Sequence, residues 1–135
     1  MDGFQCYRIS DIKTMTPEPY AEFAEAALKK RGERKQKKPR VSLASIEKLL
    51  CSANCAFPLV TIHREKIKPN VCWIGQVVQV RRGRLSLLEI GPDAKWDEEP
   101  TEYKVDEITR VDFGGGYEDA LRLVGGKPPD LARLP

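Results

Sequence analysis

The chain has 135 residues, of which 41% are hydrophobic and 32% charged, and its formal net charge is +3. This composition is typical of one folded domain and excludes a disordered chain, while the lack of a run of about 18 apolar residues excludes a membrane helix. The first residues do not form a secretory signal peptide, and four cysteines without such a signal favour reduced thiols. We therefore expect a cytoplasmic protein.

The N-terminal part of the chain predicts a strand, a helix and a basic linker. Residues 4–15 alternate weakly in polarity, which predicts a short strand that ends before a turn at 16–19. One apolar stripe at helical spacing follows, formed by Tyr20, Phe23, Ala24, Ala27 and Leu28. Residues 29–40 contain no apolar side chain. We therefore assign 1–31 to a partial strand–turn–helix unit and 32–41 to a basic linker.

The rest of the chain predicts a second helix and five strands. Ser42 is a good N-cap for a helix whose buried face comprises Leu43, Ile46, Leu49 and Leu50. From Phe57 the apolar period changes to two, and strands are expected at residues 59–63, 71–80, 85–90, 103–105 and 108–113. Gly83 supplies a positive φ in a tight hairpin, and a short helix is expected at 117–124. Five short strands and tight turns predict a small, strongly bent antiparallel barrel, with a bend or bulge at Gly75.

An internal repeat connects the two ends of the chain. Residues 7–13 align with residues 103–109 at an offset of 96, and in each copy a tyrosine that begins a predicted helix follows, Tyr20 and Tyr117. Chance similarity of two strand–turn–helix units is the alternative. If the repeat is real, the N-terminal segment is the closing end of a first barrel. It then docks on the second barrel, continues from chain upstream, or is completed by a second chain.

Two stretches resemble a known family. They are residues 57–65 (Phe-Pro-Leu-Val-Thr-Ile-His-Arg-Glu) leading to Cys72-Trp-Ile-Gly75, and residues 103–121 with Asp-Phe-Gly-Gly followed by Tyr-Glu-Asp-Ala-Leu. Together they are similar to uncharacterised bacterial proteins that contain an Sm-like small barrel, and the resemblance to longer members implies a related N-terminal barrel ahead of this one. The resemblance implies a fold without an activity, so no functional residue is transferred.

The resulting fold prediction is an α+β chain with a small bent five-stranded antiparallel Sm-like or SH3-like barrel. Two helices and a short N-terminal strand precede this barrel. Residues 42–125 hold the second helix, the barrel and the C-terminal short helix, and residues 126–135 are expected to form a flexible tail.

The candidate chemical groups favour no catalytic or metal site. Cys51, Cys55, His63 and Cys72 could bind zinc, but their spacing matches no common zinc motif, so buried reduced cysteines are favoured and no metal or cofactor is predicted. His63 with Glu65 could act as a general base, but no nucleophile motif accompanies them. The glycines at 114–116 resemble a phosphate loop but lack the following lysine and hydroxyl residue.

Charge is distributed unevenly along the chain. Residues 29–40 contain eight bases and one acid, which leaves the other residues with a net charge of −4. Nucleic acid could bind the basic residues of this segment and of the hairpin: Lys29, Lys30, Arg31, Arg34, Lys35, Lys37, Lys38, Arg40, Arg81, Arg82 and Arg84. An acidic loop could dock a protein partner through Asp93, Trp96, Asp97, Glu98 and Glu99.

We therefore predict a non-enzymatic macromolecular-interaction module that binds another protein or a second copy of itself. RNA or DNA binding through residues 29–40 and the 81–84 turn is the alternative, and an enzyme that uses His63 and Glu65 is less favoured. We expect no membrane association and no small-molecule substrate. The sequence does not identify the partner.

Overall fold

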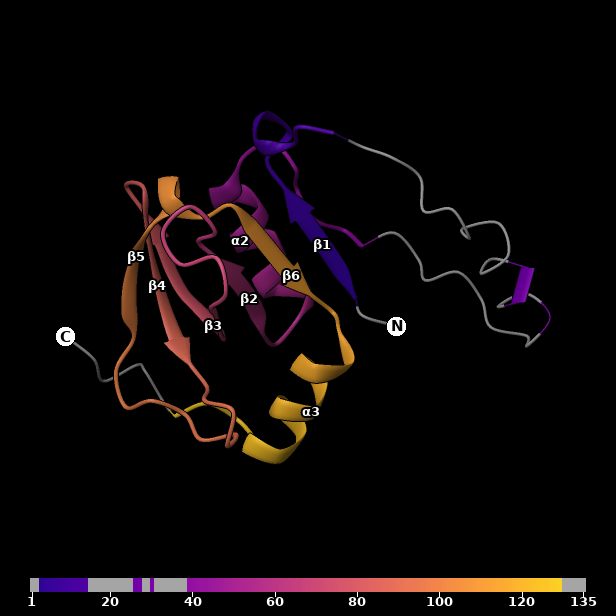
Figure 1. Ribbon diagram of the computed structural model, residues 1–135. Coiled ribbons are helices and arrows are strands. Elements are labelled where there is room, and N and C mark those ends of the chain that lie inside the picture. The colour runs from indigo at the N-terminus through magenta and orange to yellow at the C-terminus, as the bar shows by residue number, and fades with distance from the viewer. Residues whose placement is uncertain (1–2, 15–25, 28–29, 31–38, 130–135) are drawn as a thin grey trace.

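Residues 3–14, 26–27, 30 and 39–129 are described by the computed structural model (Figure 1). In chain order the elements are β1 (Phe4–Tyr7), the 3-10 helix η1 (Ile9–Asp11), α2 (Ile46–Ala56), β2 (Val60–His63), β3 (Cys72–Arg81), β4 (Arg84–Glu89), β5 (Thr101–Lys104), the 3-10 helix η2 (Val105–Glu107), β6 (Arg110–Phe113) and α3 (Gly116–Gly125). No helix in these ranges is both long and apolar enough to cross a bilayer.

The prediction of a closed five-stranded barrel is wrong. The described strands form one open, antiparallel, six-stranded sheet in the order β1-β6-β2-β3-β4-β5. Each strand can pair on two sides, and β6 pairs with β2 on one side and with β1 on the other. Because β1 occupies that second side, β5 cannot pair with β6 to close the sheet, and β1 and β5 remain as its two edges.

The helix before the sheet begins three residues later than predicted. Ser45 is the N-cap, and its Oγ accepts a hydrogen bond from the Lys48 N–H at 3.1 Å. The predicted cap, Ser42, instead accepts from the Ala44 N–H within a local turn. The helix ends where Phe57 turns extended, as expected for a residue that precedes a proline. The other predicted helix, at 20–28, falls mostly outside the described residues.

The core consists of a large and a small cluster. The large cluster lies between α2 and the sheet and includes Leu50, Ile62, Leu85, Val111 and Phe113, each with no measurable exposure. The small cluster joins α3 to the sheet and contains Leu59, Ile90 and Leu121 with Trp96 packed against them. Burial of so many large side chains is the main favourable contribution to folding.

Glycines shape the β3–β4 hairpin, as expected from the sequence. A Cβ at Gly75 would lie 2.2 Å from the Leu88 carbonyl oxygen, so only glycine allows the two backbones to approach this closely. The bulge itself lies further along, between Val77 and Gln79. The predicted positive φ at Gly83 is confirmed at 74°, and Arg82 before it is also positive at 53°, as in a type I′ turn.

Candidate functional site

The internal repeat of the sequence is also a repeat of backbone structure. In each copy a four-residue strand leads into a three-residue 3-10 helix, β1 into η1 and β5 into η2. The residues before these helices, Arg8 and Lys104, have φ and ψ of −70°, 131° and −77°, 125°. The residues after them, Ile12 and Ile108, have −85°, 117° and −79°, 121°. Equal sequence patterns therefore adopt equal conformations, which argues against chance similarity.

The two copies occupy different positions in the sheet. In an antiparallel strand, successive residues direct their backbone groups to opposite neighbours. The Val105 N–H donates to the Gly83 carbonyl at 2.9 Å, so the residues that alternate with it, Thr101 and Tyr103, face β4. Glu102 therefore directs its backbone groups outward. The outer edge of β5 has no strand partner among the described residues.

The open edge of β1 corresponds to the paired edge of β5. The Ile90 N–H donates to the Ile74 carbonyl at 2.9 Å, which directs Ile74 toward β4. Alternation across the registers of β3, β2 and β6 then directs Cys6 toward β6, and Gln5 and Tyr7 outward. Gln5 and Tyr7 align in the repeat with the two β5 residues that bind β4. Among the described residues, the first copy therefore has no counterpart of the strand β4 that pairs with the second copy.

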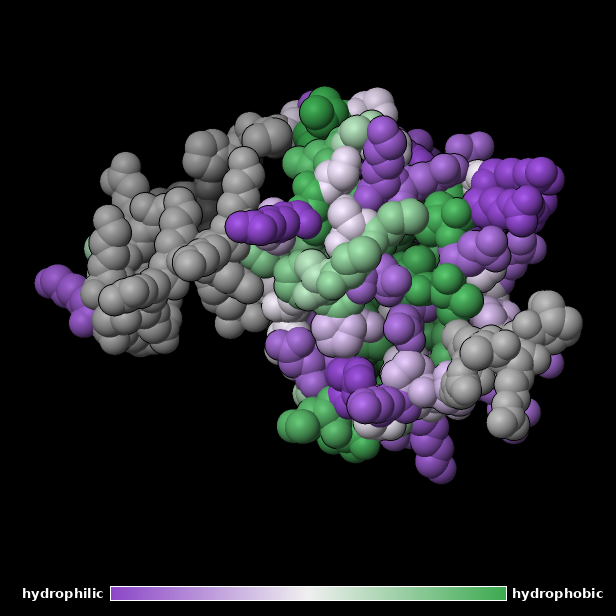
Figure 2. Space-filling model, turned by 180° about the vertical axis from the view of Figure 1, so that it is seen from behind, coloured by the Kyte–Doolittle hydropathy of each residue, from purple (hydrophilic) through white to green (hydrophobic). Residues whose placement is uncertain are grey.

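The apolar residues of the second copy are buried, whereas their counterparts in the first copy are exposed. Tyr103, Val105 and Ile108 of the second copy are 6%, 5% and 0% exposed and belong to the large core cluster. Their counterparts in the first copy are Tyr7, Ile9 and Ile12, which are 44%, 87% and 39% exposed. Figure 2 shows hydrophobic side chains at the surface at the top of the molecule, the end where Figure 1 places η1. The equivalent apolar residues of the first copy are therefore exposed, whereas those of the second copy are buried.

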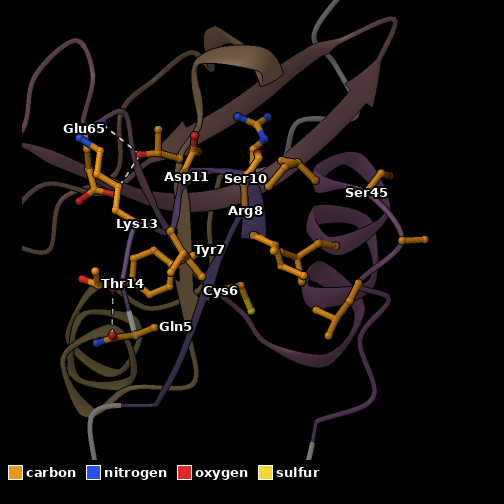
Figure 3. Close-up of a pocket in the computed structure, with 17 residues that line it drawn as sticks. Gln5, Cys6, Tyr7, Arg8, Ser10, Asp11, Lys13, Thr14, Ser45 and Glu65 are labelled. Atoms are coloured by element: carbon orange, nitrogen blue, oxygen red, sulfur yellow. Dashed lines mark hydrogen bonds between the residues drawn. The ribbon is translucent and has the colours of Figure 1, made fainter. Parts of the chain in front are cut away.

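A groove runs along this uncovered edge (Figure 3). It has a volume of about 1180 Å³ and lies between β1–η1 and the start of α2. Its apolar lining comes from Tyr7, Ile9, Ile12, Leu43, Ile46 and Leu49. Figure 3 shows the side chains of β1 and η1 opposite Ser45, the N-cap of α2. An open strand edge beside apolar side chains is the arrangement that binds an extended peptide.

Ion pairs fix η1 and η2 against the turn that follows β2. Lys66 donates to Asp11 of η1 at 2.8 Å, and Arg64 donates to Glu107 of η2 at 2.9 Å. Asp11 and Glu107 are equivalent in the repeat. Arg8 donates to the carbonyls of residues 105 and 106 at 2.9 and 3.1 Å. The first copy is therefore held in place by its polar groups while its apolar groups stay exposed.

A second cluster of polar side chains lies on the sheet face opposite α2. Arg110 Nε donates to Asp112 Oδ1 at 2.7 Å. His63 Nε2 lies 3.3 Å from Asp112 Oδ2 without forming a hydrogen bond. Glu65, the partner expected for His63, instead accepts from the Thr109 hydroxyl at 3.0 Å. The sequence could not reveal the His63–Asp112 pair, because it depends on the register between β2 and β6.

This cluster does not activate a thiol. Cys72 lies beside His63 on the neighbouring strand. Cys72 is exposed as a residue, but partial desolvation of its thiol, and then the charge of Asp112, raise its pKa above the usual value, so the thiol stays protonated at neutral pH. Burial and Asp112 raise the pKa of Cys6 in the same way. The hydrogen bond to Asp112 raises the pKa of Arg110 and keeps it charged.

The four candidate zinc ligands are not brought together. Cys51 and Cys55 lie on α2, whereas His63 and Cys72 lie on strands and are neighbours of each other. In the described ranges, no group of three or more histidine, cysteine or carboxylate side chains could hold a metal ion. All four cysteines are free, and Cys51, Cys55 and Cys72 are exposed rather than buried as expected.

The charged residues singled out in the sequence lie at opposite ends of β4. The β3–β4 hairpin exposes three of the basic residues, Arg81, Arg82 and Arg84. Arg84 Nη1 lies 3.8 Å from Glu102 Oε2 on β5. Of the basic segment, Lys30 and Arg40 are described, and both are exposed. Its other basic residues, Lys29, Arg31, Arg34, Lys35, Lys37 and Lys38, lie outside the described residues.

The acidic loop is held against the small core cluster by the side chain of Trp96. Asp93, Asp97, Glu98 and Glu99 are exposed, and Asp93 accepts a hydrogen bond from the Lys95 N–H. Trp96 instead packs inward against the small core cluster and donates its indole N–H to the Gly126 carbonyl at 3.3 Å. Trp96 thereby attaches the loop to the end of α3, while the four carboxylates face solvent.

Comparison of the chain with family models, with curated proteins and with solved structures found no match.

Proposed function

We propose that this protein is a protein-binding module that takes up an extended segment of a partner along the open edge of β1. The observation that carries the proposal is an edge of β1 that has no strand partner in the described part of the chain and that adjoins an apolar groove. Backbone hydrogen bonds to the edge would supply affinity, and the groove would select side chains.

The two edges of the sheet differ in a way that supports β1 as the binding edge. Natural proteins protect exposed edges with charged side chains, which oppose strand addition. Strand β5 has Glu102 and Lys104, both exposed. Strand β1 consists of Phe4, Gln5, Cys6 and Tyr7 and has no charged residue. The β5 edge is therefore protected against association, and the β1 edge is not.

A peptide-display experiment tests the proposal. A library of random decapeptides is selected for binding to the full chain, and the selected peptides are measured against Gln5→Pro, which removes an outward N–H of β1. The matched control is Glu102→Pro, which removes an outward N–H of β5. We expect peptides that bind the wild type and Glu102→Pro equally, and Gln5→Pro about five- to tenfold more weakly, since a lost hydrogen bond is worth about 1–1.5 kcal/mol.

Two outcomes would contradict the proposal. One is that selection yields no peptide that binds the folded chain. The other is that every selected peptide binds Gln5→Pro as well as it binds the wild type, which would place the binding site away from β1.

A further inference from the structure

The repeat specifies what kind of segment the open edge takes, and this inference rests on the proposed function. In the second copy, the edge equivalent to the open edge of β1 is filled by β4. We infer that the partner segment of β1 is a β4-like strand: an antiparallel extended segment of another polypeptide, with apolar residues at two alternate positions that face Tyr7.

The register of the partner follows from the repeat. Leu85 pairs with Tyr103 and Leu87 pairs with Thr101 in the second copy. Transferred by the repeat offset, the equivalent partner residues lie opposite Tyr7 and Gln5. Residues opposite each other in a sheet project to the same face and touch. The two apolar partner residues would therefore cover Tyr7, as Leu85 and Leu87 cover Tyr103 in the large core cluster.

The other face of the partner strand would meet the groove. Side chains that alternate with the two apolar residues project toward α2, where the groove is lined by Leu43, Ile46 and Leu49. Leu43 is 72% exposed and has room for a contact. Strand β4 already has this composition, because Leu88 alternates with Leu85 and Leu87 and all three are fully buried. A strand that is apolar on both faces fits this edge better than one that is apolar on a single face.

The described strands of a second copy cannot supply such a strand without unfolding. Its β4 is already paired on both sides, with β3 and with β5. Of its two sheet edges, β5 has the charged residues Glu102 and Lys104, and β1 directs Gln5 and Tyr7 outward instead of two apolar residues. The partner is therefore a different polypeptide with a free segment of the β4 pattern.

The test uses a synthetic peptide with the sequence of residues 83–90, Gly-Arg-Leu-Ser-Leu-Leu-Glu-Ile, added to the full chain. The control peptide has both apolar positions, Leu85 and Leu87, changed to serine. We expect saturable binding of the first peptide and binding at least about tenfold weaker for the control, because the control lacks the apolar surface of both leucines. Hydrogen exchange of the chain's amides reports the edge. At saturation the Gln5 and Tyr7 amides should exchange at least about tenfold more slowly.

The outcomes separate this inference from the proposed function. If display yields peptides that depend on Gln5 but the 83–90 peptide does not bind, the inference is overturned and the proposed function stands. Equal binding of the two peptides, or slower exchange only at Glu102, also overturns it. If neither the library nor the peptide binds, both the inference and the proposed function fail.

If the peptide binds only after Tyr20 and Phe23 are changed to serine, the chain's own residues cover this surface and the inference is wrong. A homodimer of the chain that persists when the peptide is added would also overturn the inference, because a second copy would then occupy the edge of β1.

Discussion

Two glycines illustrate how backbone contact determines what a single residue can be. Gly75 faces the backbone of β4 across the sheet, whereas Gly116 begins α3 at a point where an added Cβ would have no atom within 4 Å. The first glycine is required by close approach, and at the second there is room for a side chain. The same substitution should therefore have opposite effects at the two sites.

We expect Gly75→Ala to lower the free energy of unfolding by about 1–3 kcal/mol, because its Cβ would overlap the Leu88 carbonyl and force the strands apart. Gly116→Ala is the control and should be neutral or stabilising by up to about 1 kcal/mol. Urea denaturation of the two variants measures both values. An unchanged stability of Gly75→Ala would contradict the close approach of β3 and β4.

Tyr103 makes the free energy of unfolding depend on pH in the alkaline range. Its hydroxyl donates to Glu89 Oε2 at 2.7 Å, and burial, followed by this hydrogen bond, raises the pKa of Tyr103 above its usual value of about 10. The folded state thus keeps the proton to a higher pH than the unfolded state does. The stabilisation is complete below about pH 10 and is lost as the pH rises above that value.

We therefore expect Tyr103→Phe to be less stable than the wild type at pH 8 by about 1 kcal/mol, the value of a typical hydrogen bond. The difference should shrink between about pH 10 and 12, because only the wild type loses this contribution there. Chemical denaturation of both proteins across this range gives the measurement. A difference that grows with pH would show that the sign is wrong.

Among the elements, β1 is the one whose role the sequence predicted least. Its position as a short strand is confirmed, and this strand pairs with β6, while most of the helix expected to dock with it lies outside the described residues. The pairing of Phe4 with Phe113 joins residues at opposite ends of the chain, so no local pattern could predict it. That pairing is also what makes the closed barrel wrong.

Local patterns succeeded where the determinants are local. The alternation of apolar residues located β2, β3, β4 and β6 to within a few residues. The β3–β4 hairpin follows from Gly83. The sequence predicted only part of the candidate site. The repeat was visible, but the exposure of Ile9 against the burial of Val105 depends on tertiary contacts.

Proline substitutions should separate the two edges of β1. We expect Cys6→Pro to lower the free energy of unfolding by about 1–3 kcal/mol, because it removes an N–H directed at β6 and leaves a β6 carbonyl unpaired. Gln5→Pro removes an outward N–H and should cost less than about 0.5 kcal/mol. Thermal denaturation of both variants provides the measurement. Equal losses would contradict the assignment of Gln5 to the open edge.

For the whole molecule, β1 acts as a cover for the rest of the sheet. The ring of Phe4 lies 5.6 Å from that of Phe113 and 6.3 Å from that of Phe57. Without β1, these rings and one side of β6 would face solvent, and β6 would become an unprotected edge. The sheet therefore depends on its first strand both for stability and for solubility.

A chain that begins at residue 39 tests this dependence. We expect its free energy of unfolding to be lower by at least about 2 kcal/mol, because the apolar contact of Phe4 is lost. It should also associate with itself through β6 as its concentration rises. Denaturation and size-exclusion chromatography measure the two effects. Addition of a peptide of residues 1–14 should reverse both, and failure of the peptide to bind would contradict the role of β1 as a cover.

The distance along the chain between β1 and its partner has a consequence for synthesis on the ribosome. Phe4 emerges early, but Phe113, which it faces, is translated about 100 residues later. At about 5–20 residues per second, β1 waits about 5–20 seconds before its partner strand exists. During that interval it is an uncharged, apolar strand with no partner and both edges open. Chaperones that bind extended apolar segments should therefore bind β1 during this interval.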